Sequence, residues 1–395
     1  MRGKPIGVPY DSDAASRTPL QPARMFVFIL SFLISFALVF AIMPSVIRIA
    51  VEKKLVATPE ARSSHHTITP CLGGIPIFLG VLFCSLLLTP MAQWDNLQYI
   101  LSALVIVFMI GTKDDISQLS AGKKTAGLVI AIAILVTRGE VRLESLYGLF
   151  GVTSTVPYWL TVAASAFTLL VISNAFNLID GIDGLAGTIG IIAMLTFGTW
   201  FFVVGNVHLG ILALAASGGL LAFLYYNMSK TRKTFMGDTG ALVIGMLLGI
   251  VTVEFIDVCS TGDIPATYRF AHPIAVAVGI LIIPLFDTIR VFVTRLLRGV
   301  SPMKPDRRHI HHLLIDSNFS HVQATFILAM TNLGFISLAF FLDPILNLHA
   351  ILAVEIGLAL ILTYLLNQYA RRIRRENKLR EEAEAHTTHR VPQAV

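Results

Sequence analysis

Long apolar runs separated by short polar segments extend over most of this chain. Each run is close to the roughly 20 residues that a helix needs to cross the hydrocarbon core of a bilayer. Eleven such runs lie at 25–50, 72–91, 98–112, 125–137, 158–180, 184–205, 208–227, 237–256, 270–294, 322–341 and 346–367. The pattern predicts an all-α polytopic membrane protein with about 11 transmembrane helices at 25–367, a disordered polar arm at 1–24 and a basic tail at 368–395.

The composition agrees with a membrane protein. Only 14% of the 395 residues are charged and 55% are hydrophobic, whereas a soluble domain carries roughly 25% charged residues. The three cysteines, Cys71, Cys84 and Cys259, are scattered and form no CxxC pair, which argues against a disulfide framework or a zinc knuckle. These features exclude a secreted disulfide scaffold, a disordered regulator and a soluble nucleic-acid binder.

The lysines and arginines fall mainly on one side of the predicted membrane. The loops and tail on that side hold 21 of them, against 7 on the other side. Because positive residues are enriched in cytoplasmic loops, this bias predicts a cytoplasmic C-terminus and a periplasmic or outside N-terminus. Arg371, Arg372, Arg374 and Arg375 follow the last run, and they are typical of a helix on anionic lipid headgroups or of a plain topology anchor.

Acids and histidines gather at those ends of the runs that face the predicted cytoplasm. They form five clusters: Asp114–Asp115, Asn174 to Asp183, Asp238, Asp287 and His309 to His312. Ionisable groups in or beside membrane helices are costly and usually functional. The arrangement predicts a cytoplasmic-face active site for an anionic, water-soluble substrate and a divalent cation. A cation-coupled transporter, the remote alternative, would need its acids near mid-membrane.

The longest cluster has four polar residues spaced by three: Asn174, Asn177, Asp180 and Asp183. Residues at this spacing drift by about 60° per step on an α-helix, so neighbours share a face and the two ends do not. Gly181 and Gly184 predict that the helix breaks here. Such a break would turn both aspartates toward one pocket.

For two further acids the sequence allows a structural role as well as a functional one. Asp238 stands between two glycines at the start of a run, where it can approach a ligand or simply cap a helix. Asp287 precedes Arg290 by three residues, a spacing that also suits an internal ion pair. Neither residue identifies a site by itself.

The last cluster combines histidines with arginine. Arg307, His309, His311 and His312 lie within six residues. Arginine forks and histidine donors suit the oxygens of a diphosphate. Zinc is the rival ligand, but the sequence offers no evident partner cysteines or histidines, and magnesium held by carboxylates fits the other clusters better.

Five motifs follow one another over about residues 55–314. They are Pro59-x-x-Arg62-x-x-His65 leading to Pro70-x-x-Gly73-Gly74; Gly111-x-x-Asp114-Asp115; Asn174-Ala-x-Asn177-x-x-Asp180-Gly-x-Asp183-Gly-Leu-Ala; Phe235-Met-Gly-Asp238-x-Gly; and Pro305-Asp306-Arg307-x-His309-Ile-His311-His312. In this order they resemble the polyprenyl-phosphate N-acetylhexosamine-1-phosphate transferases, of glycosyltransferase 4 type. Within that family the resemblance is to the bacterial undecaprenyl-phosphate N-acetylglucosamine-1-phosphate transferase branch.

The resemblance implies a reaction and residue roles. A sugar-1-phosphate, foremost GlcNAc-1-phosphate, would pass from a UDP-sugar to undecaprenyl phosphate and leave UMP. Asp114, Asp115 and Asp180 would be catalytic, and Asn177 and Asp238 would hold Mg²⁺ or Mn²⁺. The implied substrate-binding residues are His65, Lys124, Asn174, Asp183, Arg307, His309, His311 and His312.

The resemblance also implies a setting. The protein would lie in the bacterial inner membrane and start a lipid-linked cell-surface polysaccharide such as the O-antigen of lipopolysaccharide or a cell-wall polymer, and a homodimer is compatible with it. Departures from the family pattern at Ala57, Ser63, Ala121, Gly122 and Leu128 leave the proposed carboxylates in place. They keep the sugar open to another UDP-N-acetylated amino sugar or to MurNAc-pentapeptide. One-step attack is favoured over a covalent aspartyl intermediate, which stays open.

Overall fold

The computed structural model describes residues 22–57, 69–94, 96–154, 156–261, 264–300 and 308–388, and within them the chain is almost entirely helical. The α-helices are α2 (Pro22–Glu52), α3 (Gly74–Leu88), α4 (Leu97–Ile116), α5 (Ala121–Thr137), α6 (Tyr158–Ile179), α7 (Leu185–Val204), α8 (Val207–Asn227), α9 (Gly237–Thr261), α10 (Pro273–Ile280), α11 (Ile282–Leu297), α12 (Ile310–Ile315), α13 (His321–Leu342) and α14 (Leu348–Thr388). Short 3₁₀ turns occupy Met91–Gln93, Leu149–Gly151 and Ala266–Tyr268, and β1 (Val56–Ala57) pairs antiparallel with β2 (Thr69–Pro70).

The helices confirm an all-α polytopic membrane protein. Every apolar run coincides with a helix, the ninth with the pair α10 and α11. By length and composition, seven helices of the described chain can each cross a membrane, and the bent pair α10–α11 adds an eighth if it counts as one span. The shorter α3 and α5 and the acid-bearing α4 account for the difference from eleven, so the full span count stays a prediction.

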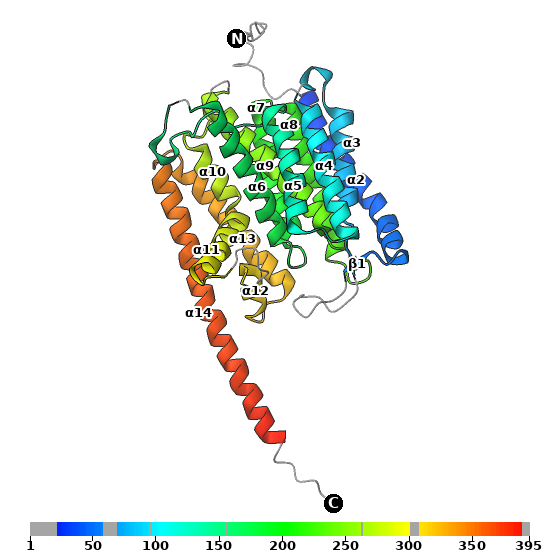
Figure 1. The fold of residues 1–395 in the computed structure, drawn as a ribbon, viewed down its shortest axis with the longest axis vertical. Coiled ribbons are helices and arrows are strands. Elements are labelled where there is room, and N and C mark those ends of the chain that lie inside the picture. The colour runs from blue at the N-terminus through cyan, green and yellow to red at the C-terminus, as the bar shows by residue number, and fades with distance from the viewer. Residues whose placement is uncertain are drawn as a thin grey trace, which may run out of the picture.

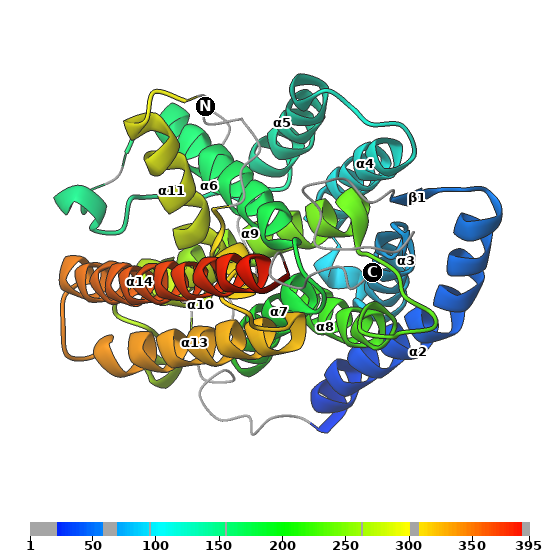
Figure 2. The same cartoon turned by 90° about the horizontal axis from the view of Figure 1, so that it is seen from below.

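Two helices form the centre of the bundle. In the apolar windows of α8 and α9, 83% of the residues are buried, whereas the other candidate spans reach 44% at most. Seen from below, α9 lies in the middle, with α2, α3 and α4 on one side and α10, α13 and α14 on the other (Figure 2). The start of α9 is therefore enclosed by neighbouring helices, and this is the segment that carries Asp238.

Close glycine contacts fix α9 against α3 and α4. A Cβ atom on Gly74 would lie 2.1 Å from the backbone nitrogen of Gly240, and one on Gly111 would lie 2.5 Å from Cα of Thr239. Only residues without a side chain permit these approaches. Backbone bonds from Gly73 to Phe235 and from Gly74 to Met236 hold the same region. The second and fourth motifs of the sequence are thus brought together.

The ninth run is a broken helix. The axes of α10 and α11 differ by 82°. Pro284 has no N–H for the carbonyl of Ile280, its i−4 partner, so the hydrogen-bond ladder fails there. The side-chain amide of Asn332 in α13 donates to that carbonyl instead, at 3.2 Å. The break turns α11 across the end of the bundle, toward α12.

The last helix continues beyond the bundle. Figure 1 shows α14 as one helix that extends well past the other elements. No break separates its apolar part from the basic segment after residue 367. Arg374 in this extension lies 2.6 Å from Asp316, just after α12. The tail expected at 368–395 is therefore helical as far as Thr388, and the expected arm lies almost wholly outside the described residues, which begin at Pro22.

Candidate active site

The second carboxylate of the Asp114–Asp115 pair holds the first turn of α9. Asp115 Oδ1 accepts from the backbone N–H of Asp238 at 2.7 Å. Its Oδ2 accepts from the backbone N–H of Thr239 at 2.9 Å and from the Thr239 hydroxyl at 2.5 Å. Gly237 before them has φ of +72°, and a Cβ there would lie 2.0 Å from the Cys71 carbonyl oxygen. Asp115 thus caps α9 and fixes where Asp238 stands.

Lys124 joins the second and fourth motifs. Its ammonium lies 3.0 Å from Asp114 Oδ2 and also donates to Asp238 Oδ1. Asn177 donates through Nδ2 to the same Asp238 oxygen at 2.9 Å, which leaves the amide oxygen of Asn177 available to another partner. Four predicted site residues, one each from α4, α5, α6 and α9, therefore meet, with the lysine between the two acids.

The helix break expected in the third motif is present. α6 ends at Ile179, α7 begins at Leu185, and Gly184 between them has φ of +81°. Burial, followed by the charges of Asp238, Asp115 and Asp183, raises the pKa of Asp180 to about 7. Among the described residues none donates a hydrogen bond to this carboxylate. Asp180 therefore adds negative charge to a group that already contains Asp238.

Asp183, at the other end of that turn, contacts a lysine and a histidine. Its Oδ2 lies 2.6 Å from Lys233 Nζ and 3.0 Å from His321 Nδ1. The hydroxyl of Thr325 donates to the Asp183 carbonyl at 3.0 Å. These bonds tie the α6–α7 turn to the loop before α9 and to the start of α13. Asp183 thus has side-chain partners, whereas no described residue donates a hydrogen bond to Asp180.

The histidine cluster lies on the short helix α12. The rings of His309 and His311 are stacked, with centroids 5.6 Å apart, and those of His311 and His312 are 4.3 Å apart. A Cβ atom on Gly181 would lie 2.2 Å from His311 Nε2, so the His311 ring lies directly against the α6–α7 turn. The fifth motif is thereby placed beside the third.

The environment of His311 keeps it neutral. Burial, and then the neighbouring His312, lower the pKa of His311 to about 3. A neutral imidazole has one donor and one acceptor nitrogen. His311 can therefore offer a substrate hydrogen bonds, without a positive charge.

Three predicted residues are not joined to this group by a described contact. Asn174 donates through its amide to the carbonyl of Leu170 in the same helix. His65 and Arg307 lie outside the described residues. Their expected roles stay predictions.

Sequence reasoning missed three participants. Thr239 is hidden in the Asp238-x-Gly motif as the variable position, and its hydroxyl bonds Asp115. Lys233 belongs to the basic loop 228–236, whose charges by themselves indicate only topology. His321 follows Ser320, whose side chain and that of Gln323 form a capping box at the start of α13; a histidine at such a boundary gives no hydropathy signal. Only partners distant in sequence reveal the roles of these residues.

The donor set fits a hard divalent cation. Carboxylate and amide oxygens are the ligands that magnesium prefers, and it commonly takes one or two carboxylates together with substrate phosphates. Asp238, Asn177 and the unbonded Asp180 supply such oxygens, and the accumulated negative charge calls for a cation. Within the described segments no three His, Cys, Asp or Glu side chains form a ready-made metal group.

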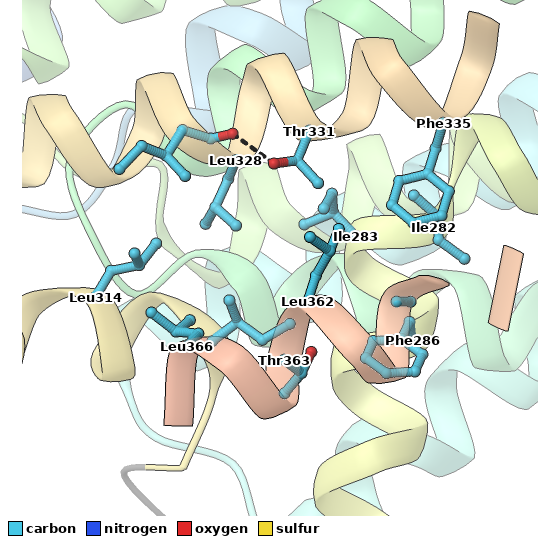
Figure 3. A pocket seen from close by; sticks show the side chains of 13 residues that line it. Ile282, Ile283, Phe286, Leu314, Leu328, Thr331, Phe335, Leu362, Thr363 and Leu366 are labelled. Atoms are coloured by element: carbon cyan, nitrogen blue, oxygen red, sulfur yellow. Dashed lines mark hydrogen bonds between the residues drawn. The ribbon is translucent and has the colours of Figure 1, made fainter. Parts of the chain in front are cut away.

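An apolar cavity of about 160 Å³ lies between α11, α12, α13 and α14. Figure 3 shows its lining side chains, among them Phe286, Leu314, Leu328 and Leu362, with the Thr331 hydroxyl bonded within its own helix. Its lining contains no charged residue. The polar centre described above, and not this cavity, carries groups suited to a charged substrate.

Comparison with known proteins agrees with this arrangement. Residues 97–256 match the model of glycosyl transferase family 4. The chain is 31% identical over 287 residues to the undecaprenyl-phosphate alpha-N-acetylglucosaminyl 1-phosphate transferase of Escherichia coli (strain K12), covering 70% of this chain and 73% of the relative. The chain belongs to glycosyl transferase family 4.

Two further relatives show similar agreement. The probable undecaprenyl-phosphate N-acetylglucosaminyl 1-phosphate transferase of Bacillus subtilis (strain 168) is 29% identical over 313 residues, 79% of this chain and 84% of the relative. The alpha-N-acetylglucosaminyl enzyme of Yersinia pestis is 29% identical over 283 residues, 70% of this chain and 74% of the relative. The family-4 protein described here is thus an enzyme, a phosphoglycosyltransferase, embedded in a membrane through several helices.

Proposed function

We propose that this family-4 enzyme transfers GlcNAc-1-phosphate from UDP-GlcNAc to undecaprenyl phosphate and releases UMP. The names of its relatives in Escherichia coli and Bacillus subtilis support the acceptor and the sugar. The observation that carries the proposal is the position of Lys124 between Asp114 and Asp238. A reaction between two anions needs a cation at the point where they meet.

The donor would lie between α9, the α6–α7 turn and α12. The N-terminal end of α9 favours negative charge near Asp238. His311 and His312 on one side and Asn177 on the other would contact the diphosphate. Asp183, held by the Lys233 ammonium and in contact with the His321 ring, would keep the nucleotide side of the site in place.

A divalent cation, Mg²⁺ or Mn²⁺, would be held by Asp238 and Asn177 together with donor oxygens. When bound, it would offset the charge of the diphosphate and stabilise the UMP leaving group. Asp180 would compensate part of the cation's charge from the α6–α7 turn. The carboxylates of this group support the choice of a hard cation.

The acceptor would approach from the side of Asp114 and Lys124. A lipid-phosphate oxygen forms a bond to the β-phosphorus of the donor, the bond from that phosphorus to the bridging oxygen breaks, and UMP leaves with the electron pair. Asp114 would take a proton from a singly protonated lipid phosphate. Asp115 is engaged by the start of α9, whereas Asp114, which accepts from the Leu119 N–H, lies beside the Lys124 ammonium that would receive the lipid phosphate, and this favours Asp114 for the role. With the oxygens of both aspartates engaged, we favour one-step transfer over an aspartyl intermediate. Alignment of the two phosphates would supply much of the rate enhancement.

The proposed placement is the inner membrane of a bacterium, with eleven spans, the site on the cytoplasmic face, the N-terminus outside and the C-terminal tail inside. The excess of lysine and arginine on the side of the site supports this orientation. UDP-sugars are made in the cytoplasm, which supports it as well. The product would begin a lipid-linked cell-surface polysaccharide.

The test is an assay of UMP release. Purified protein is incubated with magnesium, undecaprenyl phosphate and, in turn, each UDP-N-acetylhexosamine and UDP-MurNAc-pentapeptide. We expect release with UDP-GlcNAc that is abolished by EDTA and in Asp238→Asn. Release with a different donor would replace the proposed sugar, and no release from folded protein with any donor would refute the proposed reaction.

A further inference from the structure

Asp287, in the first half of α11, holds the segment that leads into the histidine helix. The residue is 2% exposed. Its Oδ2 lies 2.8 Å from His309 Nδ1, and its Oδ1 accepts from the backbone N–H of Ile310 at 3.0 Å. His309 is the residue immediately before α12 and Ile310 is its first residue. One buried carboxylate therefore fixes both a histidine and the start of the helix that carries the other two.

Arg290 and Asp287 together anchor this segment. Its Nη2 lies 2.8 Å from Asp287 Oδ1 and also donates to the carbonyl of Arg308. The ion pair expected from the i,i+3 spacing is thus present, but it does more than neutralise a buried acid. Arginine and aspartate together bind three successive residues, 308 to 310, some twenty positions away. A buried ion pair needs further hydrogen bonds to satisfy its remaining donors and acceptors, and here the segment that leads into α12 supplies them.

The bond from Asp287 fixes the orientation of the His309 ring. A carboxylate only accepts hydrogen bonds, so Nδ1 of His309 is the donor and the opposite edge of the ring, with Nε2, is left for a substrate. His309 stacks on His311, which lies against Gly181 beside Asp180. The break at Pro284 turns α11 so that Asp287 faces α12. The chain of contacts thus leads from the broken helix to the α6–α7 turn.

We propose that Asp287 is a positioning residue for the sugar-nucleotide donor, which it serves by holding His309 and the start of α12 in the orientation that binds the diphosphate. This inference rests on the proposed function. Asp287 touches no substrate in this account and acts through the histidines. Removal of an outer partner of this kind commonly costs 10- to 100-fold in binding or rate.

The test measures steady-state UMP release with the full-length protein in lipid nanodiscs, varying UDP-GlcNAc and undecaprenyl phosphate separately. Asp287→Asn keeps the size and one acceptor oxygen but removes the charge. We expect the KM for UDP-GlcNAc to rise at least 10-fold while the KM for undecaprenyl phosphate stays within 2-fold. A merely structural defect would lower the active fraction, and hence the apparent kcat, and leave both KM values unchanged.

Asp343→Asn is the matched control. Asp343 is also buried and its carboxylate also accepts two backbone bonds, from Ala271 and His272, but it lies just past the end of α13 that is opposite His321. Its substitution should lower thermal stability and leave the donor KM within 2-fold. A rise in donor KM equal to that of Asp287→Asn would show a general loss of packing and overturn the inference.

A double substitution tests the proposed route through His309. In a His309→Ala background, Asp287→Asn should raise the donor KM by a smaller factor than in the parent, because only its bond to the start of α12 then remains; an equal factor in both backgrounds would overturn the inference. If Asp287→Asn does not fold, Arg290→Lys, which keeps the charge on a shorter side chain without the planar guanidinium, should raise the donor KM 3- to 10-fold. An unchanged donor KM in these variants with an active parent overturns this inference alone, whereas an inactive parent overturns the proposed function and the inference with it.

Discussion

Asp115 on α4 accepts two hydrogen bonds from Thr239 on α9, one from its backbone N–H and one from its hydroxyl. The two residues are 124 positions apart, and a third bond from the backbone of Asp238 completes the cap. The second carboxylate of the pair thus sets the position of the proposed metal ligand. Its contribution to catalysis then comes through the geometry of α9.

Asp115→Asn should reduce turnover at least 100-fold and also lower stability. An amide cannot accept on both sides, so at least one N–H of α9 is left unsatisfied, which costs about 1–3 kcal/mol. Thr239→Val removes only the hydroxyl bond and should cost about 1 kcal/mol with a smaller loss of turnover. Thermal unfolding and UMP release measured on both variants check this order; equal activity of Asp115→Asn and the parent would refute it.

Lys124 and Lys123 form a matched pair for testing the central cation. Lys124 contacts Asp114 and Asp238, whereas Lys123 is exposed at the start of α5. Lys124→Met leaves two close carboxylates without their shared cation and should lower kcat at least 100-fold. Lys123→Met should stay within 2-fold of the parent. Similar kinetics for both variants would mean that the observed bridge has no part in turnover.

The raised pKa of Asp180 predicts a pH-dependent stability. Because the folded pKa of about 7 exceeds the ordinary value of 3.8, the folded protein keeps a proton that the unfolded chain releases between these values. Stability should therefore fall as pH rises from about 4 to 7. Melting temperatures taken without divalent cations between pH 5 and 8 should show this slope in the parent and a flatter one in Asp180→Asn. Parallel slopes would rule out Asp180 as its source.

The contact between Gly181 and His311 can be tested with a single methyl group. Gly181→Ala places its Cβ 2.2 Å from His311 Nε2, so the ring must move. We expect the KM for UDP-GlcNAc to rise about 5- to 10-fold, as expected for a misplaced binding group, with the acceptor KM unchanged. Gly334→Ala, where nothing lies within 4 Å of the new atom, is the control. A larger rise in the acceptor KM than in the donor KM would contradict the assignment of His311 to the donor.

The helices were predictable from sequence because lipid imposes one requirement on every segment: a long apolar run. The same rule could not give the bend between α10 and α11. Pro284 indicates a lost hydrogen bond, but the compensating donor, Asn332, comes from another helix. The break at Gly181 and Gly184 was predictable because two glycines spaced by three, among polar residues at the end of an apolar run, favour a turn over a continuous helix.

The site was predictable as a set of residues and much less as a set of contacts. Motif order brought Asp114, Asp238 and the histidines into one hypothesis, but spacing cannot show that Lys124 bridges the two acids. Lys233 gave no signal because a lysine in a polar loop is common, and His321 gave none because it stands at the boundary of a helix. Their pairing with Asp183 depends on three separate segments meeting at one end of the bundle.

In the proposed reaction the sugar moves together with its phosphate. UDP-GlcNAc labelled with ³²P at the β-position distinguishes the alternatives directly, after incubation with the purified protein, magnesium and undecaprenyl phosphate. We expect the label to move to the lipid fraction, with one unlabelled UMP released for each product and no transfer by Asp238→Asn. Label that remains in released UDP while the sugar appears on the lipid would contradict it, because the bond broken would then be the one between sugar and phosphate.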